Sequence, residues 1–309
     1  MSRWTAPDTG SLDGRTVLVT GATSGLGRAA AEALLRAGAR VLGTGRDPSR
    51  VPAGVEPVAL DLADLDSVRR AAAEVRERTD DTLDVLMNNA GVMGVPPEIT
   101  VDGFERQIAT NHLGHAALTW LLMPALRGAA CSAGSGGSRN GPAPRIVVVS
   151  SLAHRGGGLD VDDLHFRRRA YRPAVAYSQS KLANLLFAAE LERRLRSQGE
   201  RPIAVAAHPG VTDTDLLGAS LRARGLGGLA RPINLLTTQK VGTGVLPQLY
   251  AATAASVRGG EYIGPRGLGE LVGYPGPARR SAAARDPGLA RRLWDVTAAE
   301  TGVAPDPGA

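Results

Sequence analysis

The chain of 309 residues contains one cysteine, Cys131, and no long apolar run. A single cysteine excludes an internal disulfide framework and a zinc site with several cysteine ligands. No stretch approaches the roughly 18 apolar residues that a membrane-spanning helix needs, and residues 1–12 lack the apolar core of a secretory signal. We therefore expect a cytoplasmic protein with no membrane partner.

Aromatic residues and lysines are also scarce. The aromatic share is 4%, and among the 36 basic residues only Lys181 and Lys240 are lysines. The net charge of +6 could indicate a polyanionic partner, but the basic residues are scattered, with their longest block at 167–169. Few aromatic side chains are available to stack on bases. We therefore expect a solvated basic surface and no nucleic-acid partner.

Hydrophobic residues make up 43% of the chain, enough for a sizeable core. The length alone permits one or two domains. No internal repeat and no change of composition divides the sequence, which predicts a single domain over residues 1–309.

Short apolar segments alternate with longer segments of helical periodicity. Continuous apolar runs such as IVVV at 146–149 indicate strands that are buried on both faces of a parallel sheet. The sequence therefore predicts a doubly wound α/β fold, with a mostly parallel sheet of about seven strands and helices on both faces. The expected strands are 15–20, 40–45, 55–62, 83–90, 145–151, 203–208 and 261–264, and the expected helices are 28–38, 64–78, 102–127, 174–198 and 239–255.

Two segments interrupt this alternation. Residues 128–144 are small, polar and rich in glycine, which predicts a flexible insertion between a helix and the next strand. Such a connection lies at the edge of the sheet away from ligands. Residues 211–238 follow the last internal strand at its carboxyl end, where we expect a substrate lid.

A glycine-rich turn, TGATSGLG at 20–27, follows the first expected strand. Gly21, Gly25 and Gly27 would let the backbone approach a pyrophosphate at the start of the next helix. An ordinary tight turn has similar glycines. The place of this turn, at the opening of the first strand–helix–strand unit, favours a dinucleotide-binding Rossmann fold.

The end of the second expected strand bears on which dinucleotide is bound. An acidic residue there would bind the adenosine ribose, whereas a basic residue would accept a 2′-phosphate. Arg46 stands at the expected point, and a guanidinium can pair with a phosphate through two hydrogen bonds. NADP(H) is therefore the expected cofactor, although Asp47 keeps NAD(H) as an alternative.

Tyr177 and Lys181 are four residues apart in an expected helix, so their side chains share one face. A phenol has a pKa near 10 and acts near neutrality only when a positive charge stabilises its anion. Lysine can supply that charge, and one of only two lysines in the chain occupies this position. The pair predicts a proton donor and its activating ammonium.

The glycine-rich turn and the tyrosine–lysine pair belong to a longer series of motifs. In chain order these are TGxxxGxG at 20–27, NNAG at 88–91, TNHLGH with Asn111, IVVVSS ending at 151, YxxxK at 177–181 and HPG at 208–210. In this order the sequence resembles the classical short-chain dehydrogenase/reductase family over nearly the whole chain. The sequences NHLGH, SSLAHR and YSQSKLANLLF are typical of the retinol dehydrogenase and protochlorophyllide reductase branch of this family. The interval of 26 residues between Ser151 and Tyr177 is also typical of that branch and is expected to shape the substrate entrance.

The resemblance implies a role for each catalytic residue. Tyr177 would protonate the carbonyl oxygen, and Lys181 would lower the pKa of Tyr177 and bind the nicotinamide ribose. Ser151, rather than Ser150, would donate a hydrogen bond to the substrate oxygen. Asn111 would hold a water that links Lys181 to solvent.

The motifs and the resemblance together predict a set of cofactor contacts. Asn88 could either contact the cofactor or bridge strands. The expected contacts are Gly21, Thr23, Ser24, Gly25, Leu26, Gly27, Arg46, Asp61, Leu62, Asn89, Ala90, Gly91, Tyr177, Lys181, Pro209, Gly210 and Thr214.

Histidines are expected to have structural roles. The spacing of His154, His165 and His208 matches no zinc pattern, and hydride transfer needs no metal, so no metal site is expected. His112 and His115 are expected to pack or cap within their helix.

The expected activity is that of an NADP(H)-dependent oxidoreductase that moves a hydride between nicotinamide and a carbonyl or alcohol. Reduction is favoured because cells generally hold the NADP pool reduced. An NAD-dependent alcohol dehydrogenase of the same fold is one alternative. A non-catalytic dinucleotide-binding sensor or scaffold is another, although such a protein would be expected to lose its tyrosine or lysine.

The expected partner is a small-molecule substrate. Leucines within 211–238 suggest a hydrophobic compound, although they can equally pack the lid itself. The resemblance also implies a homo-oligomer, either a dimer or a tetramer.

Overall fold

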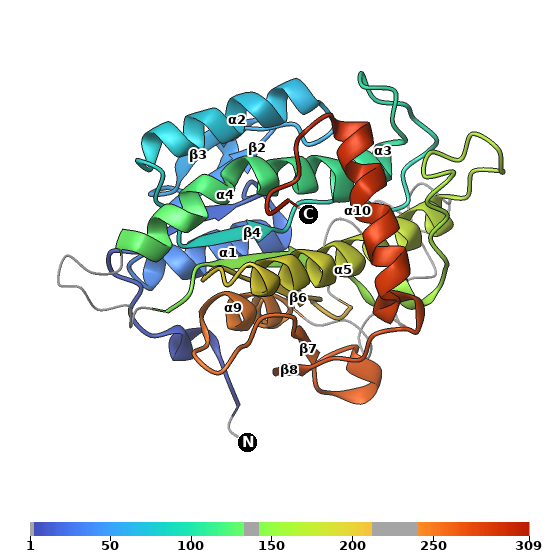
Figure 1. The fold of residues 1–309 in the computed structure, drawn as a ribbon. Helices are drawn as coiled ribbons and strands as arrows, with labels where there is room; N and C mark the ends of the chain where they lie inside the picture. Colours follow the sequence, from blue (N-terminus) through green and yellow to red (C-terminus); the bar gives the residue numbers. More distant parts are fainter. Residues whose placement is uncertain (1–2, 133–141, 212–239, 309) are drawn as a thin grey trace.

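The computed structural model describes residues 3–132, 142–211 and 240–308. One sheet runs through the molecule in the strand order β3-β2-β1-β4-β5-β6-β7-β8 (Figure 1). The first seven strands of this order are parallel, and β8 pairs with β7 in the antiparallel sense. The strands are β1 (Thr16–Val19), β2 (Arg40–Gly45), β3 (Glu56–Ala59), β4 (Val85–Asn88), β5 (Arg145–Val149), β6 (Ile203–Ala207), β7 (Tyr262–Pro265) and β8 (Pro275–Pro277).

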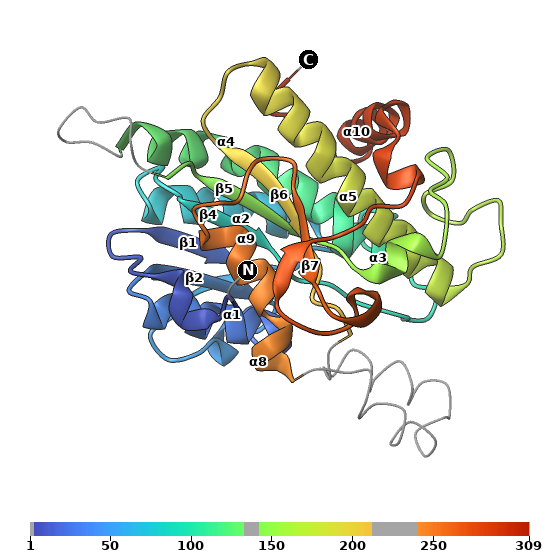
Figure 2. The ribbon, with the colours of Figure 1, turned by 90° about the horizontal axis from the view of Figure 1, so that it is seen from below.

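Helices cover both faces of the sheet, as Figure 2 shows. Two separate apolar clusters correspond to the two faces. The first face carries α2 (Leu65–Arg78), α4 (Gly114–Ser132), α5 (Pro173–Ser197) and α10 (Pro287–Thr301), and the second carries α1 (Gly25–Arg36), α8 (Val241–Gly244) and α9 (Leu246–Thr253). The predicted doubly wound, mostly parallel α/β fold is therefore confirmed. None of the helices described in the chain is both long and apolar enough to cross a membrane.

The sheet has eight strands, where the sequence predicted about seven, and the additional strand is β8. β8 consists of Pro275, Gly276 and Pro277, residues that disfavour the interior of a sheet. Because β8 is an edge strand, its prolines need no partner on the outer side, and nothing in its composition distinguishes it from a turn.

The predicted helix at 102–127 is divided. It begins as α3 (Arg106–Ile108), continues as a π-helical turn (Ala109–Leu113), and then becomes α4. Such turns are frequent at functional sites, and no apolar periodicity marks them. At the start of α4, a Cβ added to Gly114 would lie 2.2 Å from the carbonyl oxygen of Leu62, so the helix packs tightly against the loop after β3.

The two segments that interrupt the predicted alternation are only partly described. The helix α4 continues to Ser132, so the first five residues of the predicted insertion at 128–144 are helical. Residues 133–141 lie outside the described residues. Of the predicted lid at 211–238, only Val211 is described. The predicted helix at 239–255 is divided into α8 and α9, just before Pro247.

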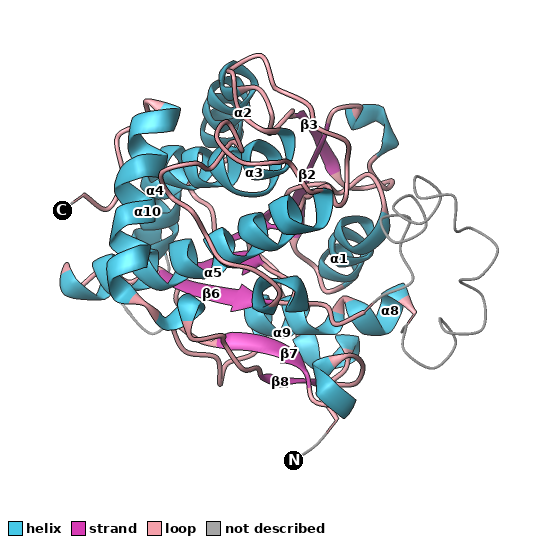
Figure 3. Ribbon diagram, turned by 90° about the vertical axis from the view of Figure 1, so that its right-hand side faces the viewer, coloured by secondary structure: helices cyan, strands magenta, loops and turns pink. Residues whose placement is uncertain are grey.

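The C-terminal helix α10 was not predicted. Asp286 begins it by accepting hydrogen bonds from the backbone N–H groups of Gly288 and Leu289. Trp294 stacks on Phe187 of α5 at 5.4 Å and meets Trp120 of α4 edge-on at 5.0 Å. Figure 3 shows α10 lying against α4 and α5.

Candidate active site

A cavity of about 260 Å³ opens at the carboxyl ends of the parallel strands. In a doubly wound sheet, ligands bind at this edge, where neighbouring strands lead to opposite faces. The loops after β1 to β6 supply most of its wall. The lining residues are Gly21, Thr23, Ser24, Gly25, Leu26, Gly27, Thr44, Gly45, Arg46, Leu60, Asp61, Leu62, Asn89, Ala90, Gly91, Val92, Arg106, Thr110, Val149, Ser150, Tyr177, Lys181 and Pro209.

The glycine-rich turn forms one wall of this cavity. Gly21 and Gly25 have positive φ values of 70° and 54°, which residues other than glycine rarely adopt. A Cβ on Gly27 would lie 2.2 Å from the carbonyl oxygen of Gly21 and 2.4 Å from Asn89 Nδ2. The side chain of Ser24, the N-cap of α1, makes no capping bond, so the N–H groups of the first turn are left for an anion.

A buried hydrogen-bond network, which no sequence motif indicates, fixes the neighbouring wall of the cavity. The hydroxyl of Thr20 accepts hydrogen bonds from the backbone N–H groups of Asn89 and Ala90, both at 2.9 Å. Nε2 of His115 lies 2.9 Å from the same hydroxyl, and its Nδ1 donates to the carbonyl of Asn111 at 3.1 Å. Burial lowers the pKa of His115 to about 3, so the ring is neutral and Nε2 accepts. His115 therefore joins two predicted parts of the site, beyond the packing role expected for it.

Arg46 and Asp47 take different directions at the end of β2. Arg46 lines the cavity. Asp47 is not among the lining residues, and its carboxylate instead accepts hydrogen bonds from the backbone N–H and the hydroxyl of Ser49. Asp61 lines the cavity, and its carboxylate accepts a hydrogen bond from the backbone N–H of Ala63 at 2.9 Å. Its contact with the cofactor stays a prediction.

Tyr177 and Lys181 both face the cavity from α5, as their spacing predicted. Nζ of Lys181 lies 5.8 Å from the centre of the Tyr177 ring and donates a hydrogen bond to the carbonyl of Val149 at 3.1 Å. Burial lowers the pKa of Lys181 to about 8. Burial raises the pKa of Tyr177, and hydrogen bonding to Ser151 opposes part of that rise. The lowering of the tyrosine pKa by Lys181 stays a prediction.

The two serines after β5 differ in their partners. The hydroxyl of Ser150 is buried and donates to the backbone carbonyl of Lys181 at 2.7 Å. Ser151 is only partly buried, and its hydroxyl accepts a hydrogen bond from the backbone N–H of Ala153 at 3.2 Å. Ser150 lines the cavity and Ser151 does not, whereas hydrogen bonding to Ser151 lowers the pKa of Tyr177. The choice of Ser151 over Ser150 therefore stays a prediction.

Some predicted site residues lie outside the cavity wall. Asn111 bonds to the backbone of Val92 and to Ser180. Asn88 is buried and donates to Thr119 of α4 at 2.8 Å, so its amide bonds to a helix and does not bridge strands as one reading of the sequence expected. Gly210 has a positive φ of 71°, and a Cβ there would lie 2.2 Å from the carbonyl of Leu271. Thr214 lies outside the described residues.

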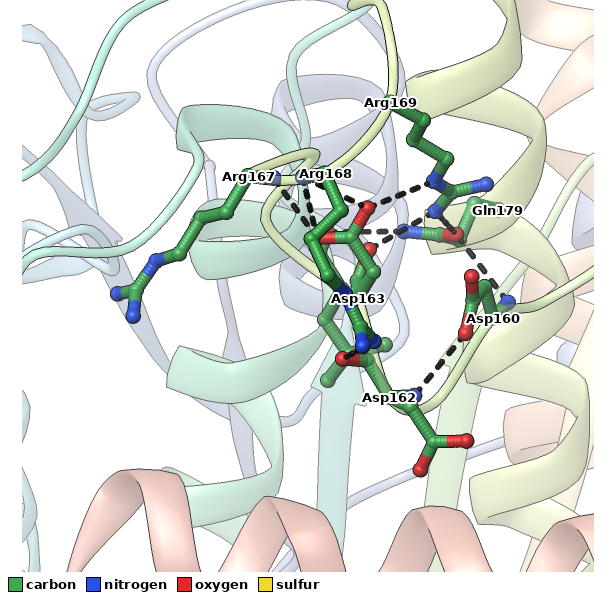
Figure 4. Close-up of polar contacts among 8 residues, drawn as sticks. Asp160, Asp162, Asp163, Arg167, Arg168, Arg169 and Gln179 are labelled. Atoms are coloured by element: carbon green, nitrogen blue, oxygen red, sulfur yellow. Dashed lines mark hydrogen bonds and ion pairs between the residues drawn. The ribbon is translucent and has the colours of Figure 1, made fainter.

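The interval between Ser151 and Tyr177 forms a segment held by its own side chains, shown in Figure 4. The buried Asp163 accepts hydrogen bonds from the backbone N–H groups of Arg167 and Arg168. Its carboxylate also forms an ion pair with Arg169 at 3.3 Å. Arg169 also donates to Gln179, which stands two residues after Tyr177 in α5. The segment is thus attached to the helix that carries the tyrosine.

The histidines without a predicted metal role have protein partners. His154 donates through Nδ1 to the carbonyl of Ser151 at 2.6 Å, and His165 accepts from the backbone N–H of Glu105 at 3.1 Å. Across residues 3–132, 142–211 and 240–308, no three or more His, Cys, Asp or Glu side chains are grouped as metal ligands.

Comparison with known proteins agrees with this geometry. The family model for short chain dehydrogenase matches residues 15–162. Human retinol dehydrogenase 13 is 37% identical over 317 residues, which span 96% of this chain and 87% of that protein. The chain belongs to the short-chain dehydrogenase family. It is an oxidoreductase of the retinol dehydrogenase-like branch, as the sequence motifs predicted.

Solved structures of the family superpose on the chain. A crystal structure of a protein from Mycobacterium paratuberculosis has a TM-score of 0.78, is 41% identical and covers 98% of both chains. The NADPH-bound carbonyl reductase from chicken fatty liver has a TM-score of 0.59 at 26% identity and covers 82% of this chain and 93% of that one. The family binds a nicotinamide dinucleotide, so the cavity is placed where a cofactor of this kind is expected.

Proposed function

We propose that the protein is an NADP(H)-dependent oxidoreductase that reduces the carbonyl group of a hydrophobic small molecule to an alcohol. The observation that carries this proposal is the convergence of the glycine-rich turn, Arg46, Tyr177 and Lys181 on one cavity. A sensor or scaffold would need the glycine-rich turn but would not need a phenol and an ammonium beside each other.

The donor set fits a dinucleotide. The uncapped start of α1 suits a pyrophosphate, and Arg46 suits a phosphate on the adenosine ribose. Gly91 leaves room beside Lys181, because a Cβ there would lie 3.5 Å from Nζ and 3.1 Å from Asn111 Oδ1. NADP(H), when bound, supplies or accepts the hydride.

The side chains of this chain would manage the proton. Tyr177 would donate its hydroxyl proton to the carbonyl oxygen of the substrate, and its raised pKa keeps the phenol protonated at neutral pH. Ser151, whose hydrogen bonding lowers the pKa of Tyr177, would hold the same oxygen as negative charge develops. Lys181 would hold the nicotinamide ribose, and Asn111 would join it to solvent through a water. These roles are the ones that the family resemblance implies.

Arg46 is expected to set the cofactor preference. In Arg46→Asp, a carboxylate would repel the 2′-phosphate and accept a bond from a free ribose hydroxyl instead. We expect the ratio of kcat/KM for NADPH to that for NADH to fall by about 100-fold. Arg50→Asp makes the same charge change four residues away, outside the cavity wall, and should leave the ratio unchanged. An unchanged ratio in Arg46→Asp would remove Arg46 from cofactor selection.

Lys181 is expected to make cofactor binding pH-dependent. Its pKa of about 8 means that the ammonium is present below that pH and is lost above it. The Kd of NADPH, measured by fluorescence titration, should therefore rise by about tenfold as the pH increases from 7 to 9.5. Lys181→Met should bind NADPH weakly and with no such pH dependence. A wild-type Kd that is constant over this range would contradict the assignment.

A substrate panel tests the proposed activity directly. Aldehydes, ketones, quinones and alcohols, each in a short and a long apolar form, are incubated with NADPH or NADP and followed at the nicotinamide absorbance band. We expect carbonyl reduction with NADPH, with lower KM values for the longer apolar compounds. Binding of NADPH without turnover of any compound would favour the scaffold, and faster alcohol oxidation with NAD would favour the NAD-dependent dehydrogenase.

A further inference from the structure

Arg106 lines the cavity, although no motif in the sequence marks it. It is the first residue of α3, one turn before Thr110, which also lines the cavity, so the two share a helical face. Its guanidinium is paired with Glu98 through Nη1 and Oε1 at 2.6 Å. The Arg106 side chain is 19% exposed and that of Glu98 is 55% exposed. A cation is therefore held at the border between the cavity and solvent.

The packing around α3 places this cation in a definite part of the cavity. Asp102, four residues before Arg106, accepts a hydrogen bond at 2.9 Å from the backbone N–H of Leu65, which begins α2 just after the loop that follows β3. After α3 and the π-helical turn, Gly114 at the start of α4 packs against the carbonyl of Leu62 in the loop after β3. The segment that carries Arg106 is thus attached at one end to the start of α2 and at the other end to the loop after β3.

The loop after β3 belongs to the adenosine half of the site. Arg46, at the end of the neighbouring strand β2, stands where the adenosine ribose is recognised in this fold. Tyr177 and Lys181 enter from α5, beside β5, on the other side of β1 and β4. The reacting nicotinamide must lie at that second end, so Leu62, Thr110 and Arg106 surround the end that holds the base.

We propose that Arg106, oriented by Glu98, contacts the adenine base of the bound dinucleotide. A planar guanidinium can stack on the face of a purine and donate to its ring nitrogens, and one that is already paired loses little freedom on binding. Adenine is common to NADPH and NADH, whereas the 2′-phosphate is not. Arg106 therefore adds affinity for both dinucleotides, while Arg46 discriminates between them. This inference rests on the proposed function, because it assumes a dinucleotide in the cavity.

The test compares the Kd values of NADPH and NADH by fluorescence titration in wild type and Arg106→Met. We expect both values to rise by about fivefold with their ratio unchanged. The inhibition constant of AMP, which carries the base, should rise by the same factor, and that of nicotinamide mononucleotide should not. Glu98→Gln keeps the guanidinium and an acceptor oxygen but removes the negative charge of its partner, so a smaller rise is expected.

Arg76→Met provides the matched control. Arg76 is also an arginine in a carboxylate pair, with Asp81 at 2.7 Å, but it lies near the end of α2 and outside the cavity wall. Its loss should leave every Kd unchanged. A rise confined to NADPH would assign Arg106 to the 2′-phosphate and overturn the contact with the base, and unchanged values would overturn any contact. If wild type bound neither dinucleotide, the proposed function itself would be wrong.

Discussion

Replacing Tyr177 by phenylalanine is expected to lower kcat/KM for carbonyl reduction by about 1,000-fold. The substitution removes one oxygen and leaves the ring that lies against Lys181. A positioned general acid contributes about 100- to 10,000-fold, and Ser151 alone cannot replace the missing proton. Because the ring remains, the Kd of NADPH should change by less than about twofold.

Tyr250→Phe is the matched control for this experiment. Tyr250 stands in α9, and its hydroxyl bonds to Ser256 at 2.8 Å, outside the cavity wall. Its loss should leave the rate unchanged. Equal rates for wild type and Tyr177→Phe, measured with a compound found in the substrate panel, would show that Tyr177 is not the proton donor. A large rise in the Kd of NADPH would instead show a binding role.

Gly27→Ala is expected to disable the cofactor turn. The added methyl group would lie 2.2 Å from the Gly21 carbonyl oxygen and 2.4 Å from Asn89 Nδ2, so both walls of the cavity must move. Overpacking of this kind costs about 1–3 kcal/mol. If that distortion falls on the binding site, the Kd of NADPH rises by about 10- to 100-fold. Fluorescence titration measures the Kd, and thermal unfolding measures the loss of stability.

Gly242→Ala tests whether a methyl group by itself causes these effects. Gly242 stands in α8, and a Cβ there would meet no atom within 4 Å. Alanine is favoured over glycine in a helix by about 0.5–1 kcal/mol, so this variant should be as stable as wild type or more stable, with an unchanged Kd. Tight NADPH binding by Gly27→Ala would mean that the turn does not hold the dinucleotide as proposed.

The fold was predictable where the sequence carries an apolar pattern. The strands β1, β5 and β6 are short continuous apolar runs, and their number and alternation with helices led to the doubly wound sheet. The helix α10 has a comparable signal in the sequence. Asp286 and Pro287 mark its start, and one buried face is shared by Ala290, Leu293, Trp294 and Thr297. The π-helical turn at Ala109–Leu113 has no such signal, because its geometry is imposed by packing.

The candidate site divides in a similar way. The turn at Gly21–Gly27 and the pair Tyr177 and Lys181 are local patterns, and the structure brings them to one cavity. The bond between Thr20 and His115 joins residues 95 positions apart, and the position of Arg106 depends on how the segment before α3 bonds to the start of α2. Contacts of this kind depend on tertiary structure, so one sequence read without relatives does not reveal them.

The position of α10 also limits how two copies of the chain can associate. Trp294 and Leu293 seal the aromatic surface formed by Trp120 and Phe187, and all four side chains are buried within a single chain. A second copy could dock on that surface only after α10 had detached, at a cost of about 2 kcal/mol for each large apolar side chain brought into water. While α10 stays in place, the part of α4 and α5 that it covers is therefore closed to a second copy of the chain.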